Sequence, residues 1–402
     1  MKKRILLVTQ YFYPENFKSN DLAFEMSARG YKVHVLTGIP NYPTGKYYKG
    51  YSLFKRRKEV INNVVIYRSA LIARGKGGGG RLFVNYLSWA FCSSFRALFL
   101  ALIHRYDLII VHAPSPITQG IPAIIIKRIQ KIPLYFWIMD LWPESLVSAG
   151  NINNKWILNR VNTLVKWIYK NSDKLLITSM GFKKSILSKG NFEDKIVYFP
   201  NWGEDVLLTQ NTFNIPLLPH GFRLMFAGNI GEAQDFESIL QAALLLKENK
   251  NIHWVILGDG RKKAYVEDFI KKNSLESTLH LLGKYPLETM PNFFEKADVM
   301  LVTLKDEPIF NLTVPAKIQA YMAAKKPIIA MINGEGKEII RNADCGFSVS
   351  AGDYKALTEL VKEVSSMDKE ILKRKGENGF EYYKENYTKT KCLDNLCKII
   401  EN

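Results

Sequence analysis

The chain has 402 residues, 47% of them hydrophobic and 23% charged, and this size and composition predict two packed domains rather than one. Its net charge of +18 requires an anionic partner or surface. No helix-turn-helix, zinc-finger or RNA-recognition pattern accompanies the charge, so we expect no nucleic acid as a partner. The four cysteines show no close metal-binding spacing, which favours free thiols in a reducing compartment over a disulfide framework or a zinc site.

Short β-branched runs alternate with helical patterns along the first half of the chain, which predicts an α/β fold with parallel sheets and crossover helices. The first run follows Met-Lys-Lys-Arg and superficially resembles a signal peptide. It is too short and lacks a small-residue cleavage site, so it predicts a buried strand. The strands expected in this half are Ile5–Thr9, Val33–Thr37, Val64–Tyr67, Leu108–His112, Leu134–Ile138, Leu175–Thr178 and Ile196–Phe199.

Basic and aromatic residues mix in the stretch from Tyr51 to Trp89, for example in Phe54–Lys58. Such a mixture suits an anionic lipid surface, so we expect peripheral membrane attachment here, with an ordinary solvated basic face as the alternative. The stretch from Leu82 to Ile103 is long and apolar enough to span a bilayer. Polar residues interrupt it, however, and favour a buried or surface-seated helix.

A second series of strands begins after the polar stretch Asn211 to His220, which we interpret as a linker between domains. The tail from Phe380 to Asn402 is predicted to be helical, and its apolar residues need a surface to cover. The strands expected in this half are Leu224–Ala227, Trp254–Leu257, Leu279–Leu282, Val299–Thr303 and Ile328–Met331.

Polar and acidic residues follow three strands of the first half, at the edge where ligands bind in open α/β sheets. Asp140 and Glu144 lie among bulky aromatic residues, which can raise a carboxyl pKa and favour a proton-transfer role. Glu144 could instead simply begin a helix after Pro143. The turns Gln10–Asn16 and Gly38–Pro43 are expected to line the same site.

Two glycine-rich turns mark the second half, Ala227–Gly231 after one strand and Gly258–Arg261 after the next. Glycine lets the backbone approach a phosphate closely, and the following helix offers free N–H groups. Tight turns need glycine regardless of ligand, so each turn alone is weak evidence. Together, with Arg261 able to pair with a diphosphate, they indicate a phosphate site.

The segment Asn311–Ala323 places Pro315 in the first turn of a predicted helix, where its missing N–H costs nothing. The neighbouring amides would then point outward as a seat for an anion. Lys317 would lie one turn inside and reach the same anion. The alternative is an ordinary amphipathic helix with an exposed lysine.

Taken together, these segments resemble the GT-4 family of retaining glycosyltransferases, and more narrowly the N-acetyl-L-fucosamine transferases of bacterial O-antigen and capsule assembly. The resemblance covers essentially the whole chain. Its marks are Tyr11–Asn16, Gly38–Pro43, Asp140–Ser145, Pro200–Trp202, Gly228–Gln234, Gly258–Arg261 and Val314–Pro327.

The resemblance implies the GT-B fold, in which two Rossmann-like domains face each other across a cleft and a C-terminal helix crosses back to the first. The acceptor domain would be residues 1–205, the nucleotide-sugar domain residues 206–380, and the crossing helix residues 381–402. Donor-binding residues would be Gly228, Asn229, Gly231, Gln234, Gly258, Asp259, Gly260, Arg261, Tyr285, Asn311, Thr313, Val314, Pro315 and Lys317. Acceptor-binding residues would be Tyr13, Glu15, Asn16, Asn41, Tyr42, Glu144 and Asn201.

The family also implies a reaction, front-face displacement with retention. Its donor would be a UDP-linked N-acetylated hexose such as N-acetyl-L-fucosamine, and its acceptor an undecaprenyl-diphosphate-linked saccharide at the inner face of the cell membrane. Lys317 and Arg261 would stabilise the leaving diphosphate, and Asp140 would orient the acceptor hydroxyl or assist its proton. No metal or other cofactor is expected, because helix N-termini and basic side chains carry the positive charge.

Two departures from the family pattern bear on catalysis. The usual pair of glutamates, eight positions apart, falls on Leu312 and Ala320, whose side chains accept no hydrogen bond. Glu307 or Glu335 could supply a carboxylate instead. Met139 precedes Asp140 where many relatives have a histidine. Two other functions therefore stay open, a nucleotide-sugar 2-epimerase of the same fold and a non-catalytic nucleotide-sugar-binding protein.

Overall fold

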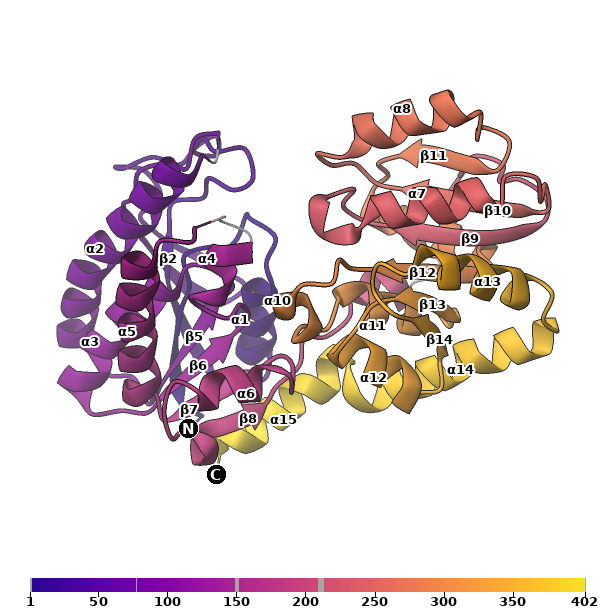
Figure 1. The fold of residues 1–402 in the computed structure, drawn as a ribbon. Coiled ribbons are helices and arrows are strands. Elements are labelled where there is room, and N and C mark those ends of the chain that lie inside the picture. The colour runs from indigo at the N-terminus through magenta and orange to yellow at the C-terminus, as the bar shows by residue number, and fades with distance from the viewer. Residues whose placement is uncertain (1, 77, 149–151, 209–212, 402) are drawn as a thin grey trace. The chain divides into compact units, whose positions relative to one another are not determined.

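A computed structural model of the protein describes residues 2–76, 78–148, 152–208 and 213–401. The chain divides into two compact units, Met1–Phe199 and Pro200–Asn402. Each unit is a sheet with helices on its faces, as the alternation of strand and helix patterns predicts (Figure 1). The first two residues of the expected linker, Asn211 and Thr212, lie outside the described residues.

Eight strands of the described chain form the sheet of the first unit, in the order β3-β4-β2-β1-β5-β6-β7-β8. They are β1 (Arg4–Val8), β2 (Lys32–Gly38), β3 (Lys58–Ile61), β4 (Val64–Ser69), β5 (Leu108–Ala113), β6 (Leu134–Ile138), β7 (Lys174–Ile177) and β8 (Ile196–Tyr198). All neighbours pair in parallel except β3, which runs antiparallel to β4. Because β1 has β2 on one side and β5 on the other, the strand order reverses here, where ligands bind in such sheets.

The helices of the first unit divide between the two faces of the sheet. In Figure 1, α2, α3 and α5 lie on one side of the strands and α1 on the other. Helix α2 contacts α3, and α3 contacts α5. The helices are α1 (Lys18–Ala28), α2 (Gly79–Ile103), α3 (Gly120–Gln130), α4 (Glu144–Ser148), α5 (Lys155–Asn171) and α6 (Phe182–Leu187).

Six strands of the second unit form a parallel sheet in the order β11-β10-β9-β12-β13-β14. They are β9 (Phe222–Ala227), β10 (Ile252–Leu257), β11 (Leu279–Gly283), β12 (Val299–Thr303), β13 (Ile328–Met331) and β14 (Gly346–Val349). The strand order reverses at β9, because β9 has β10 on one side and β12 on the other. The carboxyl ends of β9 and β12 are therefore the second place where this fold favours a ligand.

Alternate residues of these strands build a core on each face of the second sheet. Leu224 and Phe226 pack with α7, α8 and α13, whereas Met225 between them packs with α9, α11, α12 and α14. The helices of this unit are α7 (Phe236–Leu245), α8 (Lys263–Asn273), α9 (Met290–Lys296), α10 (Pro308–Asn311), α11 (Ala316–Ala323), α12 (Glu335–Asn342), α13 (Tyr354–Ser365), α14 (Lys369–Asn386) and α15 (Lys389–Glu401).

The structure differs from the predicted elements in two respects. The sequence did not predict β3 and β14, which are edge strands whose residues are exposed or only half-buried and so lack a strong apolar run. The helix expected from Phe380 onward is in fact the end of α14 followed by α15. Tyr383 and Tyr387 of this tail are buried in the second unit's core, which gives these apolar residues the cover that they need.

Candidate active site

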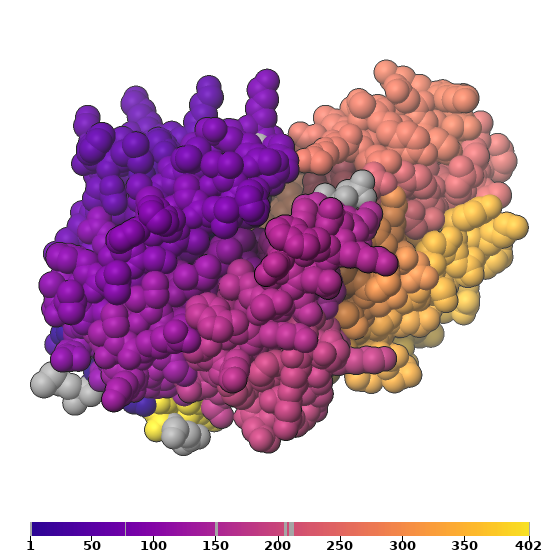
Figure 2. All heavy atoms as spheres, turned by 60° about the vertical axis from the view of Figure 1, so that its left-hand side comes forward, coloured from indigo at the N-terminus to yellow at the C-terminus, as the bar shows by residue number. Residues whose placement is uncertain are grey.

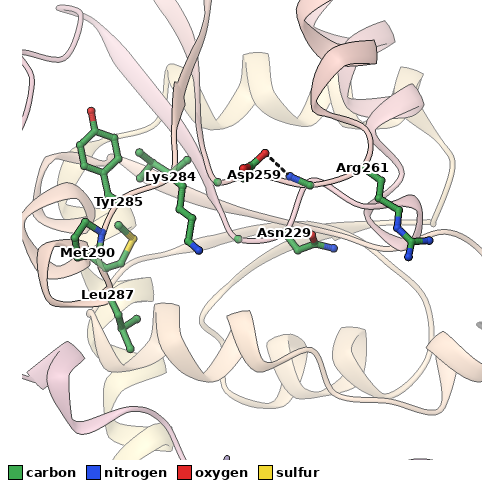
Figure 3. A pocket seen from close by; sticks show the side chains of 12 residues that line it. Asn229, Asp259, Arg261, Lys284, Tyr285, Leu287 and Met290 are labelled. Carbon is green, nitrogen blue, oxygen red and sulfur yellow. Dashed lines mark hydrogen bonds between the residues drawn. The ribbon is translucent and has the colours of Figure 1, made fainter. Parts of the chain in front are cut away.

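A pocket of about 850 Å³ opens at the carboxyl ends of β9, β10 and β11 in the second unit (Figure 3). This volume lies within the range of small-molecule sites. The pocket is lined by the turns that follow the three strands and by the start of α9. Its lining residues are Gly228, Asn229, Leu257, Gly258, Asp259, Gly260, Arg261, Lys284, Tyr285, Pro286, Leu287 and Met290.

The two glycine turns interlock at the floor of the pocket. Gly228 and Gly258 adopt φ values of +145° and +142°, which favour glycine. A Cβ atom on Gly258 would lie 1.8 Å from the carbonyl oxygen of Gly228, so no side chain fits between the turns. Gly228 N donates to Leu257 O at 2.9 Å, and Ile230 N donates to Asp259 O at 2.9 Å. The backbone of the two turns is therefore fixed before any ligand arrives.

The side chains of the pocket separate into two ends (Figure 3). Tyr285, Leu287 and Met290 gather at one end, Asn229 and Arg261 lie at the other, and Lys284 stands between them. The Tyr285 ring packs edge-on against Phe293 of α9, with 4.7 Å between ring centroids. The aromatic end suits a nucleobase, and the glycine and arginine end suits phosphates.

Lys317 lies directly beneath the first glycine turn. A Cβ atom on Gly228 would come within 2.7 Å of Lys317 Cε. The ammonium group donates a hydrogen bond to Gln234 Oε1 and lies 4.5 Å from the centroid of the Phe226 ring. Burial lowers the pKa of Lys317 to about 8. The structure thus brings Lys317 and Gln234 together at the Gly228 turn, and their role at a phosphate site stays a prediction.

The segment before α11 differs in detail from the prediction. Pro315 is the residue before the helix, in an extended conformation with φ −61° and ψ 128°, and not its first helical residue. Thr313 Oγ1 donates to Phe310 O at 3.0 Å, and Asn311 Nδ2 donates to Asp306 Oδ1 at 3.1 Å. The pocket lining does not include Gly231, Gln234, Asn311, Thr313, Val314, Pro315 or Lys317.

Sequence reasoning missed Lys284, Leu287 and Met290 in the lining of the pocket. The signal was available, because Leu279–Leu282 was a predicted strand and the residues after a parallel strand lie at the ligand-binding edge. The sequence analysis also did not predict a role for Asp306, a carboxylate that follows β12. Its Oδ1 accepts from Asn311 and Asn333, both at 3.1 Å, and these hydrogen bonds lower its pKa.

In the first unit, Glu15 joins two predicted acceptor loops. Its Oε1 accepts from the backbone N–H groups of Asn41 and Tyr42, both at 2.7 Å, and its Oε2 accepts from Phe12 N at 3.3 Å. Glu15 is only 2% exposed, and burial raises its pKa to about 7 against the opposing effect of these N–H groups. Any part of Glu15 in acceptor binding is therefore indirect, through the position of Asn41 and Tyr42.

A polar network continues from Asn41 toward α2. Asn41 Oδ1 accepts from Arg74 N at 3.1 Å and from Asn85 Nδ2 at 3.4 Å. Gln10, just after β1, donates to Asn85 Oδ1 at 2.8 Å. The Arg74 guanidinium lies 4.8 Å from the centroid of the Tyr42 ring, which is 39% exposed. The predicted residues Tyr13 and Asn16 are exposed on the preceding turn.

Asp140 follows β6 at the same edge of the first sheet. Burial raises its pKa to about 6, while a hydrogen bond with the Ser115 side chain partly opposes that shift. A carboxyl group with this pKa exists in both protonation states near neutral pH, as a general acid or base requires.

The remaining two predicted acceptor residues are engaged within the protein. Glu144 Oε1 accepts from Lys189 Nζ and Ser185 Oγ, both at 2.6 Å, and these partners hold its pKa below the usual range against the effect of burial. Asn201 belongs to the second unit, where its carbonyl oxygen accepts from Gln319 Nε2 at 3.0 Å.

Comparison with known proteins gives matches to both halves of the chain. Residues 19–202 match the model of the glycosyl transferase 4-like domain, and residues 211–382 match that of the glycosyl transferases group 1. The chain is 32% identical to the probable glycosyltransferase WbjE of Pseudomonas aeruginosa, over 58% of this chain and 60% of that protein. It is 22% identical to the putative colanic acid biosynthesis glycosyl transferase WcaI of Escherichia coli, over 74% of each. Among solved structures, HepE of Anabaena in complex with UDP is similar, with a TM-score of 0.71 at 13% identity over 99% of both chains.

Two tandem α/β units, each a largely parallel sheet that reverses strand order near its centre, define the GT-B fold, which the likeness to HepE confirms. Since two glycosyltransferase models match consecutive stretches that together span most of the chain, the protein belongs to the GT-B glycosyltransferases.

Proposed function

We propose that the protein is a retaining, GT-4-type glycosyltransferase of bacterial surface polysaccharide synthesis. It transfers an N-acetylated hexose, such as N-acetyl-L-fucosamine, from a UDP-sugar to a saccharide on undecaprenyl diphosphate. The observation that carries the proposal is the pocket of the second unit, with an aromatic end for a base and a glycine and arginine end for a diphosphate. The relatives WbjE and WcaI are named as glycosyltransferases, WcaI of colanic acid synthesis, and HepE was solved with UDP.

The chemistry depends on stabilising the diphosphate as it leaves. Arg261 at the pocket and Lys317 beneath the Gly228 turn supply positive charge where negative charge grows in the transition state. This positive charge supports a reaction that needs no metal or other cofactor. Asp140 orients the acceptor hydroxyl or assists its proton, and its raised pKa supports that role.

The acceptor places the enzyme on the cytoplasmic face of the cell membrane as a peripheral protein. Helix α2 supports this location, because among the described residues it is the one helix long and apolar enough to span a bilayer. Only 33% of its apolar window is buried. Trp89 and Ala97 are fully buried, however, and α2 packs on α3, which favours a helix seated at the surface over one that crosses.

Transfer of a radiolabelled sugar to extracted bacterial lipids tests the proposal. The label of a UDP-N-acetylhexosamine is expected to move into the organic phase only when enzyme and lipid extract are both present. If the enzyme alone changes the sugar of the donor, the protein is an epimerase. If it binds UDP and neither reaction occurs with any UDP-sugar supplied, it is a non-catalytic binding protein.

A further inference from the structure

A second pocket, of about 450 Å³, lies in the first unit between α2 and the segment that follows β4. Leu71, Ile72 and Ala73 form one wall, and Ser88, Phe91 and Cys92 of α2 form the opposite wall. Leu53 and Arg81 also line the pocket. The volume lies within the range of small-molecule sites, and nothing in the donor chemistry described above uses it.

The backbone polar groups of the wall Leu71–Ala73 are largely hydrogen-bonded within the protein, so the free surface of the pocket is mainly apolar apart from Arg81. Ile72 N donates to Ser88 Oγ at 2.9 Å, and Ile72 O accepts from Asn85 Nδ2 at 2.6 Å. Leu71 O accepts from the hydroxyl of Tyr47, and Ala73 O accepts from Arg81 Nε at 2.9 Å. A polar ligand would find few partners here, whereas a hydrocarbon chain would bury apolar surface without displacing a hydrogen bond.

One side of the pocket is continuous with an exposed apolar stripe on α2. The stripe follows helical spacing and includes Phe91, which is 66% exposed and also lines the pocket. Figure 2 brings forward the side of the first unit on which α2 lies. A row of exposed apolar side chains on one helix face is typical of an interaction site. The stripe consists of Val84, Leu87, Phe91, Phe95, Leu98 and Leu102.

The other side of the pocket leads to the predicted acceptor residues. The wall segment Leu71–Ala73 continues directly into Arg74, which is hydrogen-bonded to Asn41 and lies over the ring of Tyr42. Arg81 is fixed at the rim by its hydrogen bond to Ala73. The Arg81 guanidinium thus lies at the apolar pocket and the Arg74 guanidinium at the polar network, and the charge of both complements that of a diphosphate.

We infer that this second pocket binds the first part of the hydrocarbon chain of an isoprenyl diphosphate, with the diphosphate held by Arg74 and Arg81. The inference rests on the lipid-linked acceptor proposed above and names the place where its lipid binds. The α2 stripe contacts the membrane, and the hydrocarbon chain of the lipid enters the pocket from there. The saccharide of the lipid points toward Asn41 and Tyr42.

Alkylation of Cys92 in the wild-type protein tests the inference, because this half-exposed thiol lines the pocket. Farnesyl diphosphate, as a soluble probe, is expected to slow alkylation of Cys92 several-fold without any vesicle present. Inorganic diphosphate should have little effect, and half-exposed Cys397 provides an internal control that no ligand should protect. Equal protection of Cys92 by farnesyl and inorganic diphosphate would contradict the inference.

A matched pair of variants separates the pocket from general membrane contact. Phe91 and Phe99 are both exposed on α2, at 66% and 53%, but only Phe91 lines the pocket. Phe91→Ala is expected to weaken farnesyl diphosphate binding by about tenfold, because the variant loses a phenyl contact that the bound ligand would bury. Phe99→Ala should leave this binding unchanged. Equal effects of the two substitutions would overturn the inference.

The outcomes also separate this inference from the proposed function. If Cys92 is not protected but sugar still moves to lipid extract, the pocket is not the lipid site and the proposed function stands. If Cys92 is protected but no UDP-sugar is used, the lipid site stands and the proposed reaction falls. If phosphatidylglycerol vesicles protect Cys92 and farnesyl diphosphate does not, the surface binds bulk lipid and the inference is wrong.

Discussion

The candidate sites of the two units lie at the same edge of a largely parallel sheet, but backbone atoms build one and side chains the other. In the second unit, the backbone of two interlocked glycine turns forms the floor of the pocket, with φ values that other residues rarely adopt. In the first unit, side-chain oxygen atoms bridge the loops, because Glu15 Oε1 accepts from Asn41 N and Asn41 Oδ1 accepts from Arg74 N. A diphosphate common to many donors suits a fixed backbone, whereas a variable acceptor suits replaceable side chains.

The pKa values of Lys317 in the second unit and Asp140 in the first unit shift in opposite directions for the same reason. Burial lowers the pKa of Lys317 to about 8 and raises that of Asp140 to about 6, so each neutral form becomes more accessible. The anion that Lys317 meets would restore its full charge. Among the described residues, burial and a hydrogen bond with Ser115 account for the Asp140 shift, and a carboxyl group without a charged partner is suited to exchange a proton. The comparison predicts a binding defect in the second unit and a turnover defect in the first.

The largest effect is expected for Asp140→Asn, which keeps the shape of the side chain and removes its acid-base function. Turnover should fall by a factor of about 100 to 10,000, the usual contribution of general acid-base catalysis, while the Kd for UDP stays unchanged. Wild-type kcat/KM should also fall as pH drops through about 6, because the carboxylate becomes protonated. Steady-state kinetics and calorimetry check both points. Nearly normal turnover in Asp140→Asn would remove this residue from the mechanism.

The next effect is expected for Lys317→Ala, which should act on binding. A charged hydrogen bond contributes about 1.5–3 kcal/mol, so the affinity for UDP should weaken about ten- to a hundredfold, with uridine little affected. Lys317→Arg should restore only part of the affinity, because a planar guanidinium does not replace a compact ammonium.

The pH dependence of UDP binding gives Lys317 an independent check. Since its pKa in the free protein is about 8, wild-type affinity should decline above this pH, and Lys317→Ala should lose that decline. Unchanged affinity for UDP in Lys317→Ala would assign the diphosphate to Arg261 and Lys284 alone.

A smaller effect is expected for Tyr285→Ala at the aromatic end of the pocket. Loss of ring stacking costs about 0.5–1.5 kcal/mol, so UDP and uridine should both bind about two- to tenfold more weakly. Tyr265→Ala is the matched control, because this tyrosine on α8 is 40% exposed and is not among the residues that line the pocket. A Tyr285→Ala variant that weakens inorganic diphosphate as much as uridine would place the base elsewhere.

The smallest effect concerns membrane attachment through the first unit. The protein should sediment with acidic liposomes more than with neutral ones at low salt, and the difference should shrink as salt screens the basic residues near Tyr51–Trp89. Some binding to liposomes should persist at high salt, because the apolar α2 stripe contributes an attraction that salt does not screen. Equal sedimentation with both kinds of liposome at low salt would show that the basic residues form an ordinary solvated surface.

The sequence predicts the second unit's site better than the first unit's. Glycines such as Gly228 and Gly258 are conspicuous in sequence because their backbone geometry excludes other residues. Glu144 and Asn201 could not be placed in the same way, since their partners Lys189 and Gln319 are 45 and 118 positions away. The lining residue Lys284 was missed although it directly follows Gly283, because this single glycine after a strand is a weaker mark than the paired turns at Gly228 and Gly258. Edge strands such as β3 were not predicted, because their exposed and half-buried residues show little alternation of apolar and polar side chains.

Hydrogen-deuterium exchange of the protein with and without UDP most directly tests whether the second unit binds the donor and the first unit the acceptor. We expect UDP to protect the amides of residues 228–231, 258–261 and 284–290 in the second unit most strongly. Any protection of residues 10–16 and 38–43 in the first unit should be smaller, because these turns are assigned to the acceptor. Protection of the first unit's turns with none at the Gly228 and Gly258 turns would contradict the account.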